Sequence, residues 1–248
     1  MLALTLLGAS ACATTSRLDI GFDADPLNGS PASFPPPNPP ADSISTITSE
    51  GVTSAVVDNP SGGRWLRLTP QPSFIADPDR RHRAVLATSD QFTTSPAANI
   101  RGSMRMRLDG PGTVTIGMRA VQAGGASPDF LGGIAVGNHV TGVPSQAYVV
   151  PGFTLARVTN DIVPLNSAGN MASPPAGTAF NVNWSIDQAS RTLSASVNGG
   201  PPVSTTFPAA SAGAATTPIA QLSLWVWMEK VGPSTAFFVD SLRAEEYR

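Results

Sequence analysis

Apolar and polar residues alternate along much of the chain, and this period of two constrains the fold more than any other feature. It is clearest at 180–187, where the apolar positions are Phe180, Val182, Trp184 and Ile186. The pattern recurs at 103–108, 113–119 and 192–197, and no window keeps a helical period. Such alternation is typical of strands with one face on a core and the other in water. The sequence therefore predicts an all-β protein whose core includes Met104, Met106, Phe180 and Trp184.

Turn-forming residues separate these runs at short intervals. Asp109-Gly110-Pro111-Gly112 and Asn198-Gly199-Gly200 each lie between two alternating runs, which is a strong hairpin signal. Many short strands joined by Gly, Pro, Asn and Ser are typical of a β-sandwich. Residues 18–248 are therefore predicted to form one domain with long Pro- and Gly-rich loops. The further strands expected are Leu18–Phe22, Val52–Asp58, Arg64–Thr69, Ala84–Thr88, Ala147–Val150, Phe153–Val158, Val203–Phe207, Ile219–Met228 and Ala236–Ala244.

The low charge content narrows the possible functions. Only 13% of the residues are charged, about half the usual share of ~25%, and the net charge is −2. Disorder requires few apolar residues and a high net charge, whereas 41% of this chain is hydrophobic. Because no basic excess exists, nucleic acid is not an expected partner. The single cysteine excludes an internal disulfide, so packing alone must hold the fold.

The first residues predict export. An apolar run at 2–7 is followed by small residues at 9–11 and by Cys12. This order fits a signal peptide of residues 1–11. It also resembles bacterial lipoproteins, which implies a lipidated Cys12, a tether of residues 12–17 and a place in the cell envelope, at the outer membrane or cell surface. The alternative is a periplasmic or secreted protein cleaved after Ala11, with Cys12 a free thiol.

Four segments resemble, in their order, bacterial extracellular domains of the concanavalin A-like and laminin G-like type. They are FDADPLNGSP, VVDNPSGGRWLRLT, FNVNWSIDQASRTLSASVNGG and FFVDSLRAEEY. The resemblance implies an antiparallel two-sheet jelly roll with a concave face that often holds a glycan. Such domains include carbohydrate-binding modules, glycanases, polysaccharide lyases and structural modules, and the fold does not choose among them.

Residues for catalysis are sparse. Glycosidases need two carboxylates at a set separation, and Glu229, the best single candidate, has no second carboxylate near it in the sequence. We interpret Glu229 as a residue at the rim of a ligand site. A lyase could use His139 or Tyr148 as the base, with an arginine to neutralise charge, but no spacing requires this. His82 lies in a loop-like run of charges that largely cancel. No catalytic residue is predicted.

Arginines gather on one predicted strand face. Arg105 and Arg107 lie on the non-core side of their strand, and Arg101 precedes them on that side. A hairpin at 109–112 would bring Arg119 beside Arg105, with Asp109 the only local acid. Guanidinium groups suit carboxylates and sulfates, so the face could bind an anionic glycan or a lipid headgroup. The alternative is a solvated strand face whose charges discourage edge pairing.

Two tryptophans share another strand. Leu222, Leu224, Val226 and Met228 form one face, which leaves Trp225 and Trp227 on the other. Flat aromatic rings could stack on sugars, or a loop or second sheet could cover them. Trp184 is predicted in the core, whereas the phase of Trp65 fits either a buried or an exposed position.

Three aspartates suggest a structural calcium site. Domains of the kind resembled here often hold calcium between the first and last strands, and Asp23, Asp25 and Asp240 stand in corresponding places. Calcium takes carboxylate and carbonyl oxygens as ligands. The alternative is that Asp23 and Asp25 bond to the turn at Asn28-Gly29.

The hypothesis drawn from the sequence is a lipid-anchored envelope module that binds a glycan or another surface ligand without catalysis. Trp225 and Trp227, with Arg105, Arg107, Arg119 and Glu229, are the expected ligand residues. No cofactor is required, although calcium is an option. A structural or protein-interaction module is the alternative, followed by a polysaccharide lyase or glycoside hydrolase.

Overall fold

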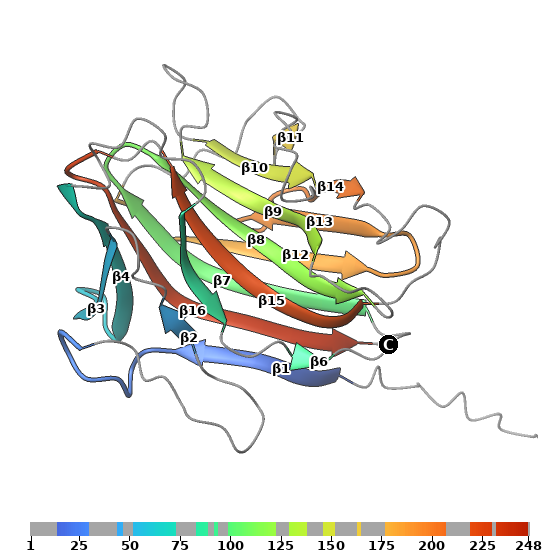
Figure 1. The fold of residues 1–248 in the computed structure, drawn as a ribbon, viewed down its shortest axis with the longest axis horizontal. Coiled ribbons are helices and arrows are strands. Elements are labelled where there is room, and N and C mark those ends of the chain that lie inside the picture. Colours follow the sequence, from blue (N-terminus) through green and yellow to red (C-terminus); the bar gives the residue numbers. More distant parts are fainter. Residues whose placement is uncertain are drawn as a thin grey trace, which may run out of the picture.

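A computed structural model describes the protein over residues 14–29, 44–46, 52–72, 83–88, 92–93, 99–122, 129–137, 146–151, 163–164, 177–206, 219–229 and 232–247. Every element in these residues is a strand, and each strand pairing is antiparallel. The strands form two stacked sheets, and the long strands of both sheets lie along roughly the same axis (Figure 1). This confirms the predicted antiparallel β-sandwich. No helix in the described part of the chain has the length and hydropathy to cross a membrane.

The first sheet, sheet A, contains the first and last strands of the chain. Its spatial order is β14 (Val203–Thr206), β13 (Thr192–Val197), β12 (Phe180–Asp187), β7 (Asn99–Asp109), β16 (Ala236–Tyr247), β4 (Arg64–Pro70) and β3 (Val52–Asp58). β1 (Thr14–Gly21) also pairs with β16, along the half that β4 leaves open.

The second sheet, sheet B, lies on the other side of the core. Its spatial order is β11 (Val163–Pro164), β10 (Gln146–Pro151), β9 (Asp129–Gly137), β8 (Thr113–Gln122), β15 (Ile219–Glu229), β5 (Arg83–Thr88) and β2 (Ile44–Thr46). β6 (Phe92–Thr93) pairs with the first part of β15.

One hydrophobic core fills the space between the sheets, and the alternating residues form it. Met104 and Met106 of sheet A and Ile116 and Met118 of sheet B are at most 1% exposed. The predicted core residues of β12 and β13 are buried as well. Burial of apolar surface is the main stabilising force in such a fold, and here it confirms which face of each strand points inward.

The hairpin predicted at 109–112 is wrong. This turn joins β7 of sheet A to β8 of sheet B, so the two strands do not pair. A second crossing, at 232–235, joins β15 to β16 and packs on the first: the Thr235 hydroxyl donates to the Pro111 carbonyl. Gly110, at φ +74°, lies so close to Ser234 that a Cβ would stand 2.6 Å from its carbonyl oxygen. Glycine at position 110 therefore allows the two crossings to pack closely, and it also allows the positive φ of the turn.

Other predictions have mixed outcomes. The hairpin at 198–200 is confirmed, because β13 pairs with β14. The sequence did not predict β9, because two adjacent glycines interrupt its apolar pattern. Cys12, the signal segment, His82, His139 and the strand expected at 153–158 lie outside the described residues.

Candidate functional site

The tryptophans and the arginine stripe, defined as Arg101, Arg105 and Arg107, belong to different sheets. Trp225 and Trp227 lie on β15 of sheet B, whereas the stripe lies on β7 of sheet A. The core separates the two sheets, so their outer faces point away from each other. The prediction that these groups share one ligand site is therefore wrong.

Strand register groups four of the predicted ligand residues on sheet B. Trp225 pairs with Gly117 of β8, and Trp227 pairs with Thr115. Arg119 pairs with Ser223, and Glu229 pairs with Thr113. All these positions alternate with the buried Leu222, Leu224, Ile116 and Met118, which places them on the outer face. Arg119 thus belongs with the tryptophans and not with Arg105.

Small residues continue this face beyond β8. Gly133 of β9 pairs with Gly117, and Ala135 pairs with Thr115. On the far side of β9, Tyr148 of β10 pairs with Ala135. Trp227, Thr115, Ala135 and Tyr148 therefore form one row of paired residues, or rung, across four strands. Two aromatic positions flank two small ones in this row.

At Gly133 the lack of a side chain is required by close packing. A Cβ at Gly133 would stand 2.6 Å from the carbonyl oxygen of Ile116. Gly117, Gly133 and Ala135 are buried although they lie on the outer face. These small residues of the outer face are thus covered, and larger groups around them must provide the cover.

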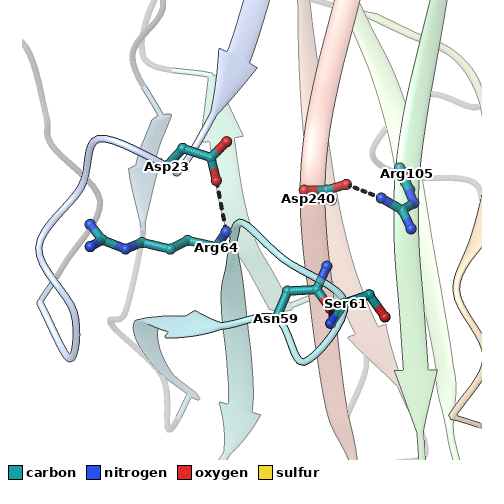
Figure 2. A network of polar contacts seen from close by, with 6 residues as sticks. All are labelled: Asp23, Asn59, Ser61, Arg64, Arg105 and Asp240. Carbon is teal, nitrogen blue, oxygen red and sulfur yellow. Dashed lines mark hydrogen bonds and ion pairs between the residues drawn. The ribbon is translucent and has the colours of Figure 1, made fainter.

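On sheet A, each arginine of the stripe has an acidic partner. Arg105 Nη1 lies 2.8 Å from Asp240 Oδ2, and this ion pair appears in Figure 2. Arg107 Nε lies 3.1 Å from Asp109 Oδ1. Arg101 donates through Nε to Glu245 Oε1. The expectation that Asp109 is the only local acid is wrong, because β16 runs beside β7 and supplies Asp240 and Glu245.

Aromatic rings lie beneath two of these arginines. Trp65 and Phe238 pack edge to face, with centroids 6.3 Å apart and planes at 86°. The Arg107 guanidinium lies 3.9 Å from the Phe238 centroid and 5.8 Å from that of Trp65. Arg105 lies 5.5 Å from the Trp65 centroid. Cation–π attraction and the apolar stems of the arginines therefore cover Trp65, which is only 2% exposed.

This arrangement changes what the stripe can bind. A guanidinium that already faces a carboxylate and an aromatic ring has a compensated charge. The local field is close to neutral, which weakens the case for an anionic ligand at Arg105 and Arg107. Their geometry is that of a structural layer covering Trp65.

The three candidate calcium ligands do not form a site. Asp23 Oδ1 accepts from the Arg64 backbone N–H at 2.7 Å (Figure 2). The Arg64 guanidinium donates to the Asp25 carbonyl. Asp240 pairs with Arg105. No group of three or more His, Cys, Asp or Glu residues is arranged for a metal within the described ranges. The bond from Asp23 to the β3–β4 turn also replaces the one expected to Asn28-Gly29.

The sequence reading missed a groove on the outer face of sheet A, over β1, β16, β7 and β12. It has a volume of about 490 Å³ and is lined by Asp19, Arg101, Ser103, Asn183, Arg243 and Glu245. The only signal in the sequence is the set of polar residues that alternate with the core residues. These residues do not indicate a groove until the order of the strands is known.

Comparisons with known proteins support the fold. No protein-family model and no curated protein matches the chain. The alginate lyase Aly36B has a similar structure, with a TM-score of 0.53 at 12% identity over 92% of this chain and 95% of that one. A peanut lectin is similar over 94% and 97% of the two chains, with a TM-score of 0.46 at 14% identity. The likeness to Aly36B shows that the chain is a jelly-roll β-sandwich, and at this identity it shows nothing more.

Proposed function

We propose that this jelly-roll β-sandwich is a non-catalytic glycan-binding module whose ligand face is the outer face of sheet B. The observation that carries the proposal is the register, which brings Trp225, Trp227, Arg119 and Glu229 onto one face of two neighbouring strands. Arg119 is far from the other three residues in the sequence, and only the β8–β15 pairing brings it beside them.

The chemistry of this face suits a sugar. An aromatic ring offers a flat apolar surface to the C–H face of a pyranose, while arginine and glutamate can donate to and accept from its hydroxyl groups. Small residues at Gly117, Gly133 and Ala135 leave the strand surface low between Trp227 and Tyr148. A low floor between aromatic positions would let a chain lie across the strands.

The fold also guides the choice of first ligands. Aly36B is named as an alginate lyase. We therefore expect alginate oligomers, with neutral oligosaccharides for comparison, to be informative probes. Binding without any shortening of the polymer would support a module that recognises a glycan and does not cleave it.

Substitution of the tryptophans tests the proposal. We expect Trp227→Ala and Trp225→Ala each to weaken binding of a glycan-array hit by about five- to thirtyfold, since loss of a stacked ring removes about 1–2 kcal/mol. The measurement is titration calorimetry, with circular dichroism as a check on folding. The matched control is Asn181→Ala on the outer face of sheet A, which should bind as the wild type does. Unchanged affinity in both tryptophan variants would refute the proposal.

A structural or protein-interaction module is the second candidate. The observation that favours it is the burial of Gly117, Gly133 and Ala135, because a floor that is already covered leaves less room for a sugar ring. Acrylamide quenching of tryptophan fluorescence separates the two functions. Trp65 and Trp184 are 2% exposed, so strong quenching must come from Trp225 and Trp227 and would favour the glycan face. Protection of all four tryptophans would favour the second candidate.

We also propose that the module is exported and anchored to the envelope through a lipid on Cys12. Only the sequence of the first residues supports this. Detergent phase partitioning of the protein expressed in a bacterial host should place the wild type in the detergent phase and Cys12→Ser in the aqueous phase. Equal partitioning of both would instead favour a soluble secreted form.

A further inference from the structure

We infer that the groove on the outer face of sheet A is a second glycan site, built for a neutral chain with vicinal hydroxyl groups. It lies on the opposite side of the core from the proposed sheet B face and does not depend on it. Its volume of about 490 Å³ is within the range of roughly 300–1,000 Å³ typical of ligand sites.

Strand register produces the floor of the groove. Asp19, Arg243, Ser103 and Asn183 lie on one straight rung across β1, β16, β7 and β12. The next rung carries Glu245 and Arg101, with Ser185 beyond them. Ser103 and Asn183 are short, so the surface is low where these rungs cross β7 and β12.

Ion pairs hold the two long side chains at the sides of the groove. Arg243 Nε lies 2.9 Å from Asp19 Oδ1, toward β1. Arg101 donates through Nε to Glu245, and its guanidinium lies 5.0 Å from the centroid of the Tyr247 ring. Because each arginine is held by a neighbour, neither closes the floor at Ser103.

The lining keeps unused hydrogen-bonding groups. Among the described residues, the terminal amino groups of Arg101 and Arg243 have no hydrogen-bond partner, and neither do the side chains of Ser103 and Asn183. The side chains of Arg243 and Arg101 are 65% and 51% exposed, so ligand can reach them.

These groups select the ligand class. The two arginines and two acids cancel in charge, so an anion would gain little attraction and would meet Asp19 and Glu245. A hydroxyl group can accept from a guanidinium and donate to a carboxylate, so two adjacent hydroxyls can bridge one ion pair. A neutral oligosaccharide can contact both partners without adding charge, whereas a uronate oligomer brings carboxylates that Asp19 and Glu245 repel.

Amide chemical shifts of the isotope-labelled protein test this inference. We expect cellohexaose or β-1,4-mannohexaose to shift the amides of 101–103, 183 and 243–245, with a dissociation constant of about 1 mM. A hexamer of galacturonic acid should leave them unchanged. No shift there with either neutral sugar, or shifts with the uronate alone, would overturn the inference.

Matched variants separate a site from a solvated strand face. Asn183→Leu should weaken binding about five- to tenfold, because a hydrogen bond is lost, whereas Asn181→Leu on the same strand face should not. Ser103→Ile should abolish the shifts by filling the floor, whereas Ser196→Ile, two strands away on the same rung, should preserve them. Equal effects of a variant and its control would refute the site. Trp227→Ala should leave this binding intact, so failure here is distinct from failure of the sheet B face.

Discussion

Single residues show how tightly sheet A is packed. Gly102 of β7 pairs with Trp184 on one side and Ala244 on the other, and it points toward the core. The indole of Trp184 lies over it, so any Cβ at position 102 would overlap the ring and the Arg243 carbonyl. Trp184 is only 2% exposed because position 102 has no side chain.

We therefore predict that Gly102→Ala lowers the free energy of unfolding by about 2–3 kcal/mol through overpacking. Urea unfolding followed by tryptophan fluorescence measures the change. Gly21→Ala is the matched control, since a Cβ at this strand glycine meets no atom within 4 Å, and it should change stability by less than about 0.5 kcal/mol. Equal midpoints for the two variants would show that the ring over Gly102 can move at little cost.

At the scale of strands, β4, β7 and β16 form a second packed layer outside the core. Trp65, on the outer face of β4, lies among Phe238, Arg105 and Arg107. Asp240 lies at an irregularity of the β7–β16 ladder, between Val239 and Ser241, where it reaches Arg105. The arginines therefore join neighbouring strands and shield an indole whose Nε1 has no hydrogen-bond partner among the described residues.

We expect Trp65→Ala to lower the free energy of unfolding by about 3–5 kcal/mol, the range for a large buried ring, although the residue lies outside the main core. Arg67→Ala, on the same strand and face but exposed, should cost less than about 0.5 kcal/mol. Thermal or urea unfolding provides the comparison. A small effect of Trp65→Ala would mean that the outer layer of sheet A contributes little to stability.

At the scale of the whole molecule, both sheets share one core and two packed crossings. Buried residues from sheets A and B form a single hydrophobic cluster. The crossings at 109–112 and 232–235 fasten the sheets at one end through Thr235 and Pro111. With one cysteine in the chain, no internal disulfide adds to this packing.

This architecture predicts that the sheets unfold together. Urea transitions followed by far-ultraviolet circular dichroism and by tryptophan fluorescence should coincide, because neither sheet can keep its apolar face buried alone. Two separated transitions would show that the sheets are independent units.

The sequence alone determined which face is buried in the strands whose apolar and polar residues alternate. A period of two places alternate side chains on opposite faces, so the inward positions at 104, 106, 180 and 184 follow from local pattern and the hydrophobic effect. The same local rule also placed Trp225 and Trp227 together, because they share one strand. It could not resolve Trp65, whose cover comes from two other strands.

Only the tertiary structure decided which strands are neighbours. A Gly-Pro turn can close a hairpin or cross between sheets, and the turn at 109–112 crosses, so Arg119 lies in the sheet opposite Arg105. Two of the three acids that pair with the arginine stripe, Asp240 and Glu245, come from β16, more than a hundred residues away along the chain. The groove at Ser103 and Asn183 arises from strand order. Burial follows from the local alternation of apolar and polar residues. A binding face depends on the pairing of strands that are distant in the sequence, which no local pattern encodes.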